Sequence, residues 1–181
     1  MKNYVVAFLM LFAVLASQAQ NDSIPKNNFG KNEIKVNALF LLLGTFEGSY
    51  ERNLSENSAI GMSVLIPFER EFIENDINYY VSPYYRVFFG KKYAAGFFLE
   101  GFGMLNSIRT SYRYYIDSGT YHDIESTTDF ALGLGLGGKW FTKGGFVFEI
   151  NGGFGRNLFN AGNDNAVTFV GKLGFNMGYR F

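Results

Sequence analysis

Charged side chains that could take part in acid–base or ionic chemistry recur at alternate positions along this 181-residue chain. Glu47 and Glu51 are four residues apart, and paired carboxylates are a common general acid and base in hydrolytic enzymes. In an extended strand four residues span about 13 Å, which is too far for two carboxylates to act on one bond. The spacing therefore favours ion pairing with groups on neighbouring strands over catalysis.

A second candidate for catalysis is His122, the one histidine, which lies in the polar segment 107–129. Nearby serines and acids, such as Ser118 and Asp123, would complete a Ser-His-acid set. A single histidine in a polar aromatic segment is more typical of a solvent-exposed loop, and the chain has no cysteine that could join it in a metal site. We therefore expect no catalytic residues, no metal and no cofactor. A lipid-modifying enzyme is the least favoured alternative.

The segments that carry these charges alternate between apolar and polar or small residues, which is the period of a β-strand. The clearest runs from Val167 to Phe181, with an apolar residue or Gly at every odd position. Seven further segments follow the same pattern with more noise: 34–42, 46–51, 59–68, 81–89, 97–105, 130–137 and 146–154. The pattern predicts eight strands and no helix.

The connections between these segments differ in length. Apart from a short first connection around Gly44, tight turns at 53–58, 90–93 and 141–144 alternate with longer polar connections at 69–78, 106–128 and 155–166. Short turns on one side and long loops on the other are typical of outer-membrane barrels. The sequence therefore predicts an all-β fold, an eight-stranded antiparallel transmembrane β-barrel over residues 33–181.

Composition separates this barrel from the alternatives, a secreted sandwich or a lipocalin-like barrel. The chain has 22 Gly, 21 Phe and 12 Tyr, and glycines gather on the polar face of the last three predicted strands. Small residues facing bulky ones suit a narrow barrel interior, whereas a solvated face would carry Lys, Glu, Thr and Ser. Aromatic residues near the strand ends are typical of membrane girdles. The 16 acidic and 16 basic residues balance, so a nucleic-acid partner is not expected.

Two stretches resemble a known family. IKVNALFLLLGTFEGSYERNLSENSAIG is similar to the opening of a barrel family of unknown function among the small outer-membrane barrels of OmpA- and OmpX-like architecture. GKLGFNMGYRF, with Tyr179 and Phe181, resembles the signal that the outer-membrane assembly machinery recognises. The resemblance covers residues 33–181. It implies the fold, the compartment and that machinery as a partner during biogenesis, and it brings no activity.

The N-terminus predicts export. Lys2, the apolar run from Tyr4 to Ala16, and small residues at Ser17 and Ala19 indicate a signal peptide over residues 1–19. A flexible lead-in follows over residues 20–32. With the barrel pattern, this predicts the outer membrane of a Gram-negative bacterium, with its lipids around the barrel.

The register also predicts a polar lumen. It places nine charged residues on the inward face: Lys35, Glu47, Glu51, Arg86, Glu100, Lys139, Glu149, Lys172 and Arg180. Isolated buried charges cost several kcal/mol each, so the near balance favours an ion-pair network that fills the lumen. We expect Arg86, Glu100, Glu149 and Lys172 at its centre. The alternative is a narrow pore for small solutes.

The long segment 106–128 has two interpretations. Its alternation up to Asp117-Ser-Gly-Thr120 indicates a protruding hairpin, whose Tyr112, Tyr114, Tyr115 and Tyr121 would contact an extracellular partner. The alternative is a mobile loop whose tyrosines touch lipid headgroups. The sequence thus predicts a structural or surface-interaction role.

Overall fold

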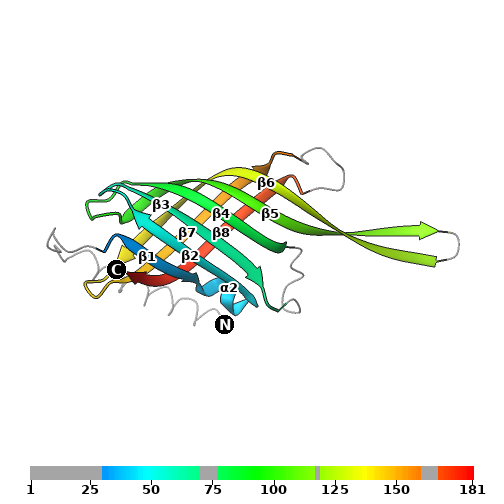
Figure 1. Cartoon of the computed structure of the whole chain (residues 1–181), viewed down its shortest axis with the longest axis horizontal. Coiled ribbons are helices and arrows are strands. Elements are labelled where there is room, and N and C mark those ends of the chain that lie inside the picture. The colour runs from blue at the N-terminus through cyan, green and yellow to red at the C-terminus, as the bar shows by residue number, and fades with distance from the viewer. Residues whose placement is uncertain (1–29, 70–76, 117–118, 160–166) are drawn as a thin grey trace, which may run out of the picture.

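The computed structural model describes residues 30–69, 77–116, 119–159 and 167–181, and these form a closed barrel (Figure 1). Its strands are β1 (Asn32–Asn37), β2 (Thr45–Asn53), β3 (Ser58–Pro67), β4 (Ile77–Phe88), β5 (Gly96–Ile116), β6 (Gly119–Phe141), β7 (Phe146–Asn157) and β8 (Phe169–Arg180). Each strand pairs antiparallel with the next, which confirms the predicted eight-stranded antiparallel β-barrel. The predicted signal peptide and residues 20–29 of the lead-in lie outside the described residues.

The first and last strands close the barrel. In the antiparallel β1–β8 pair, Glu33 lies opposite Arg180 and Val36 opposite Met177. Beyond the strand ends, the Asn32 N–H donates to the Phe181 carbonyl at 2.9 Å, and the Phe181 N–H donates back at 2.8 Å. Closure pairs the edges that an open sheet would leave exposed.

A short helix, α2 (Ala38–Leu42), replaces the second half of the predicted first strand, 34–42, and corrects the prediction of an all-strand chain. The Asn37 Oδ1 accepts hydrogen bonds from the Leu39 and Phe40 N–H groups, which caps the helix. Gly44 follows at φ +75°, a conformation that suits glycine. Residues 38–42 are all apolar, so their pattern does not distinguish a strand from a helix. The leucines have high helix propensity, which agrees with the helix that forms.

The two ends of the barrel differ. The connections 54–57, 89–95 and 142–145 lie at the end that also holds the C-terminus, which we call the turn end (Figure 1). The opposite end, the loop end, carries α2 and the β5–β6 hairpin. In the described part of the chain, no helix is long and apolar enough to cross a membrane.

The hairpin extends well past the barrel wall (Figure 1). Strands β5 and β6 have 21 and 23 residues and stay in register to the pair Ile116↔Gly119. The described pairing of β5 with β4 ends at Ile108, and that of β6 with β7 ends at Ala131. The backbone of segment 106–128 is therefore a hairpin and not an unpaired loop. Its four predicted contact tyrosines and His122 lie on it, but their side chains are outside the described part.

The outer surface of the barrel is apolar. Large hydrophobic side chains are exposed on every strand, and Leu134 in β6 reaches 76% exposure. Aromatic rings pair across neighbouring strands near the ends: Phe89 with Phe97 and Phe146 with Tyr179 at the turn end, and Phe154 with Phe169 toward the loop end. This is the inverse of a soluble barrel, whose outward side chains are polar.

Inside, aromatic rings lie against glycines. A Cβ on Gly133 would come within 2.2 Å of the Phe102 ring, and one on Gly61 within 2.4 Å of the Tyr84 ring. On Gly137 it would come within 2.6 Å of the Phe98 ring. The inward glycines thus leave the room that large rings need in a narrow barrel.

Candidate functional site

Arg86 in β4 is the centre of a buried cluster of charged groups in the lumen. Its Nε donates to Glu100 at 2.7 Å, directly across the β4–β5 pair. Its Nη1 donates to Glu51 at 2.6 Å and to Glu149 at 2.7 Å, and its Nη2 donates to the other oxygen of Glu149 at 2.9 Å. A guanidinium presents several donors in one plane, so one side chain from β4 joins carboxylates from β2, β5 and β7.

Two lysines connect these carboxylates to the rest of the lumen. The Lys35 ammonium donates to Glu51 at 2.8 Å and to Glu149 at 2.7 Å. Lys139 donates to the other oxygen of Glu51 and, at 3.1 Å, to Glu33. The register places Glu33 directly opposite Glu51 on adjacent strands. Such a like-charge pair is destabilising alone, and the lysines compensate it.

The remaining inward charges extend the network toward both ends. Lys172 in β8 donates to Glu100 at 2.8 Å. Toward the turn end, the Arg180 Nε donates to Glu33 at 2.7 Å, and its Nη atoms donate to the carbonyls of Tyr93 and Ala94. Arg180 thereby holds the β4–β5 turn across the barrel mouth.

Glu47 lies apart from Arg86. Its carboxylate accepts hydrogen bonds from the Tyr80 hydroxyl and the Asn37 amide, each at 2.6 Å. Glu51, on the same face of β2, instead binds Lys35, Arg86 and Lys139. The two carboxylates therefore have separate partners, as their spacing indicates.

Apolar clusters pack against the charged groups toward both ends. Toward the loop end a buried cluster crosses the lumen, formed by Leu65, Tyr80, Tyr84, Phe102, Met104, Ala131 and Val170. Toward the turn end Phe88 packs against Phe98 at a ring-centroid distance of 5.5 Å, with Ala59 and Ala94 beside them. The lumen is thus filled by a network of charged groups with apolar clusters packed against it toward both ends.

All nine charged residues that the sequence places in the lumen are buried there, and the four expected at the centre are connected through Arg86 and Glu100. Two buried carboxylates were missed, Glu33 and Asp129. Each lies two residues before a buried residue, Lys35 or Ala131, and so falls on the inward face of its strand. Predicted strands that began earlier would have included both.

The residues of the proposed C-terminal assembly signal lie on the outside of the seam between β1 and β8. Tyr179 faces outward, and its ring meets that of Phe146 edge to face at 5.8 Å. Phe181 is also exposed, and its backbone pairs with Asn32. These positions fit lateral contact with lipid or with another protein.

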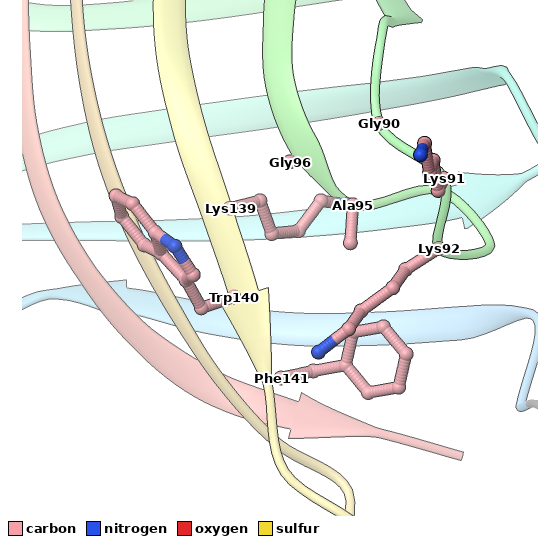
Figure 2. A pocket seen from close by; sticks show the side chains of 8 residues that line it. All are labelled: Gly90, Lys91, Lys92, Ala95, Gly96, Lys139, Trp140 and Phe141. Carbon is pink, nitrogen blue, oxygen red and sulfur yellow. The ribbon is translucent and has the colours of Figure 1, made fainter. Parts of the chain in front are cut away.

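A pocket of about 120 Å³ lies at the rim of the turn end, between the β4–β5 turn and the end of β6 (Figure 2). It is lined by Gly90, Lys91, Lys92, Ala95, Gly96, Lys139, Trp140 and Phe141. Figure 2 shows Trp140 and Phe141 projecting to opposite sides of β6, with the Lys92 ammonium beside the Phe141 ring. The sequence analysis did not predict this pocket, because it forms where the turn folds against β6.

No family model matches the chain, and no curated protein matches it. Among solved structures, the chain is similar to the crystal structure of the N-terminal β-barrel domain of Pseudomonas aeruginosa OprF. The TM-score is 0.48 and the identity 12%, over 85% of this chain and 100% of that one.

Proposed function

We propose that this protein is an integral outer-membrane β-barrel with a closed lumen, whose role is to hold the β5–β6 hairpin outside the membrane as an interaction surface. The observation that carries the proposal is the Arg86 cluster, which joins side chains from opposite walls across the lumen. An aqueous channel along the axis would have to break these contacts.

The exterior supports the membrane location. Large hydrophobic side chains are exposed on every strand, with aromatic pairs toward both ends, and this matches the lipid-facing band of such barrels. Short turns in these proteins face the periplasm, so the turn end is assigned to that side and the hairpin to the outside. The predicted signal peptide over residues 1–19 agrees with export.

The side-chain chemistry gives no support for catalysis. Within the described segments, Glu47, Glu51, Glu100 and Glu149 all accept hydrogen bonds from buried donors. A carboxylate engaged in this way is a structural ion and not a free base. We therefore propose a non-enzymatic role, with the outer-membrane assembly machinery as a partner during biogenesis and an extracellular protein as the partner of the hairpin.

Reconstitution of the purified full chain tests this proposal. We expect a band that shifts on boiling, as folded barrels do, and no steady single-channel conductance in planar bilayers. On intact cells, protease should cut within the hairpin and leave the barrel whole. Stable conductance would support the pore instead, and hydrolysis of lipid that is lost in His122→Ala would support the enzyme. Either result would overturn the proposal.

A further inference from the structure

We propose that the rim pocket of the turn end binds the phosphate headgroup of an anionic phospholipid from the inner leaflet. The inference rests on the proposed membrane location of the barrel. Lys91 and Lys92 supply the positive charge, and Trp140 lines the same pocket, with its ring on the other side of β6 from Phe141.

The β4–β5 turn holds the two lysines in a fixed place. Its inner part folds into the barrel mouth, where Ala94 and Ala95 are buried. The Ala94 N–H donates to the Glu56 carbonyl at 2.7 Å, and Arg180 donates to the Tyr93 and Ala94 carbonyls. With residues 93–95 anchored, residues 91 and 92 remain at the rim. A site on an anchored turn loses less conformational entropy when it binds a ligand.

Glycines allow the two ends of the β4–β5 turn to lie close together. A Cβ on Gly90 would come within 2.1 Å of the Ala95 carbonyl oxygen, and Gly96 has φ +95°. Both glycines line the pocket, so the missing side chains also leave its floor open. Any larger residue at Gly90 would displace the turn that carries the lysines.

The exposed charge at the turn end is mostly positive, which favours binding of an anionic ligand. Among the described residues, the exposed or partly exposed charged side chains there are mostly basic: Lys31, Arg52, Lys91, Lys92 and Lys143, against Glu56. Basic residues near a membrane surface attract anionic lipids, with about 1 kcal/mol for each Lys or Arg.

The position of the pocket selects a lipid over a free anion. Trp140 projects from the side of β6 opposite to the buried Phe141, and a Cβ on Gly138 would lie 2.7 Å from the Trp140 ring, so the indole lies against the outer face of β6 beside the pocket. On neighbouring β5, Phe97 lies opposite Gly138 and pairs with Phe89. Tryptophan and such aromatic pairs are typical of the headgroup level of a bilayer, which puts the lysines at the depth of lipid phosphates.

Trp140 is the only tryptophan of the chain, so tryptophan fluorescence reports on the lipids at this part of the rim. The full barrel is reconstituted into phosphatidylcholine vesicles that contain some phosphatidylglycerol, with bromine on the acyl chains of one lipid or the other. We expect bromine on phosphatidylglycerol to quench Trp140 beyond its share of the bilayer. The lipid preference should fall about fivefold in Lys91→Gln, and further in Lys91→Gln/Lys92→Gln.

The matched control is Lys31→Gln/Lys143→Gln, which removes the same charge from the same end but outside the pocket, and it should keep the preference. Equal loss in both double variants would mean diffuse attraction to the rim and would overturn the site. So would removal of the preference by added inorganic phosphate, which would indicate a soluble anion. If the double variant fails to fold, Lys91→Gln alone decides, since Lys91 is exposed. Quenching by both lipids in proportion to their abundance would contradict the proposed site and leave the membrane location standing. Quenching by neither lipid would contradict the membrane location as well.

Discussion

The guanidinium of Arg86 binds both oxygens of Glu149 across the barrel lumen, at 2.7 and 2.9 Å. The two residues come from β4 and β7, which do not pair with each other, and they are 63 positions apart in sequence. This contact fixes the distance between opposite walls, and with it the closed state of the interior.

Replacing Arg86 with Met should be among the most damaging single changes in the barrel. It removes the cation that contacts Glu51, Glu100 and Glu149 together. Breaking a buried ion pair by removing one partner costs about 3–5 kcal/mol. Urea unfolding of the barrel in lipid or detergent measures the loss. Arg52→Met, on exposed β2 surface, is the control and should stay within about 0.5 kcal/mol of wild type. Similar stability of the two variants would contradict the central role of Arg86.

The two carboxylates of β2 should respond differently to neutralisation. Glu51→Gln removes the negative charge that Lys35, Arg86 and Lys139 share, with an expected loss of about 3–5 kcal/mol. Glu47→Gln affects hydrogen bonds from the neutral donors Tyr80 and Asn37, with an expected loss of about 1–3 kcal/mol. The same unfolding assay compares them. A larger loss for Glu47 would show that its environment is more ionic than these contacts indicate.

Two glycines on neighbouring strands should differ sharply when changed to alanine. At Gly133 the new methyl would lie 2.2 Å from the Phe102 ring, so Gly133→Ala should cost about 1–3 kcal/mol through overpacking. At Gly101, where nothing lies within 4 Å of an added Cβ, Gly101→Ala should be neutral or stabilising. Thermal unfolding followed by the gel mobility shift measures both. Restoring space with Phe102→Leu should recover part of the Gly133→Ala loss.

The hairpin should be dispensable for folding. Arg109 and Ser126 lie opposite each other in register, so replacing residues 110–125 with Asn-Gly would close β5 and β6 with a two-residue turn. The shortened barrel should still show the mobility shift on boiling, with stability within about 1 kcal/mol of wild type, because the neighbouring strands end before this segment. Binding to any extracellular partner should be lost. A shortened chain that cannot fold would assign the hairpin to the barrel's own stability.

The alternation of inward and outward positions along each strand was enough to predict much of the architecture. Glu100 and Arg86 could be assigned to the inner face because their apolar neighbours, such as Leu99 and Val87, occupy the other. This alternation alone could not show which of them meet, since contacts across the lumen depend on the stagger and diameter of the barrel. The link between Arg86 and Glu149 and the separation of Glu47 from that cluster are both of this kind.

Two parts were misjudged, for different reasons. Residues 38–42 are all apolar, which is compatible with a buried strand or with a helix, and the Asn37 cap favours the helix. The rim pocket depends on the β4–β5 turn folding inward, which Arg180 from the far end of the chain imposes. No pattern within residues 89–95 reports a partner so distant in sequence.

The seam between β1 and β8 has a consequence for biogenesis. Glu33 and Lys35 come from the first strand, whereas Arg180 and Lys172 come from the last, and all four belong to the same buried network. Before β8 is in place, Glu33 lacks one of its cations and Glu100 lacks Lys172. A sheet that lacks β8 therefore carries buried carboxylates with fewer cations, and closure of the barrel supplies the missing ones. Glu33 and Glu100 therefore have all their cations only when β8 is in place, which we expect to make closure of the barrel close to all-or-none.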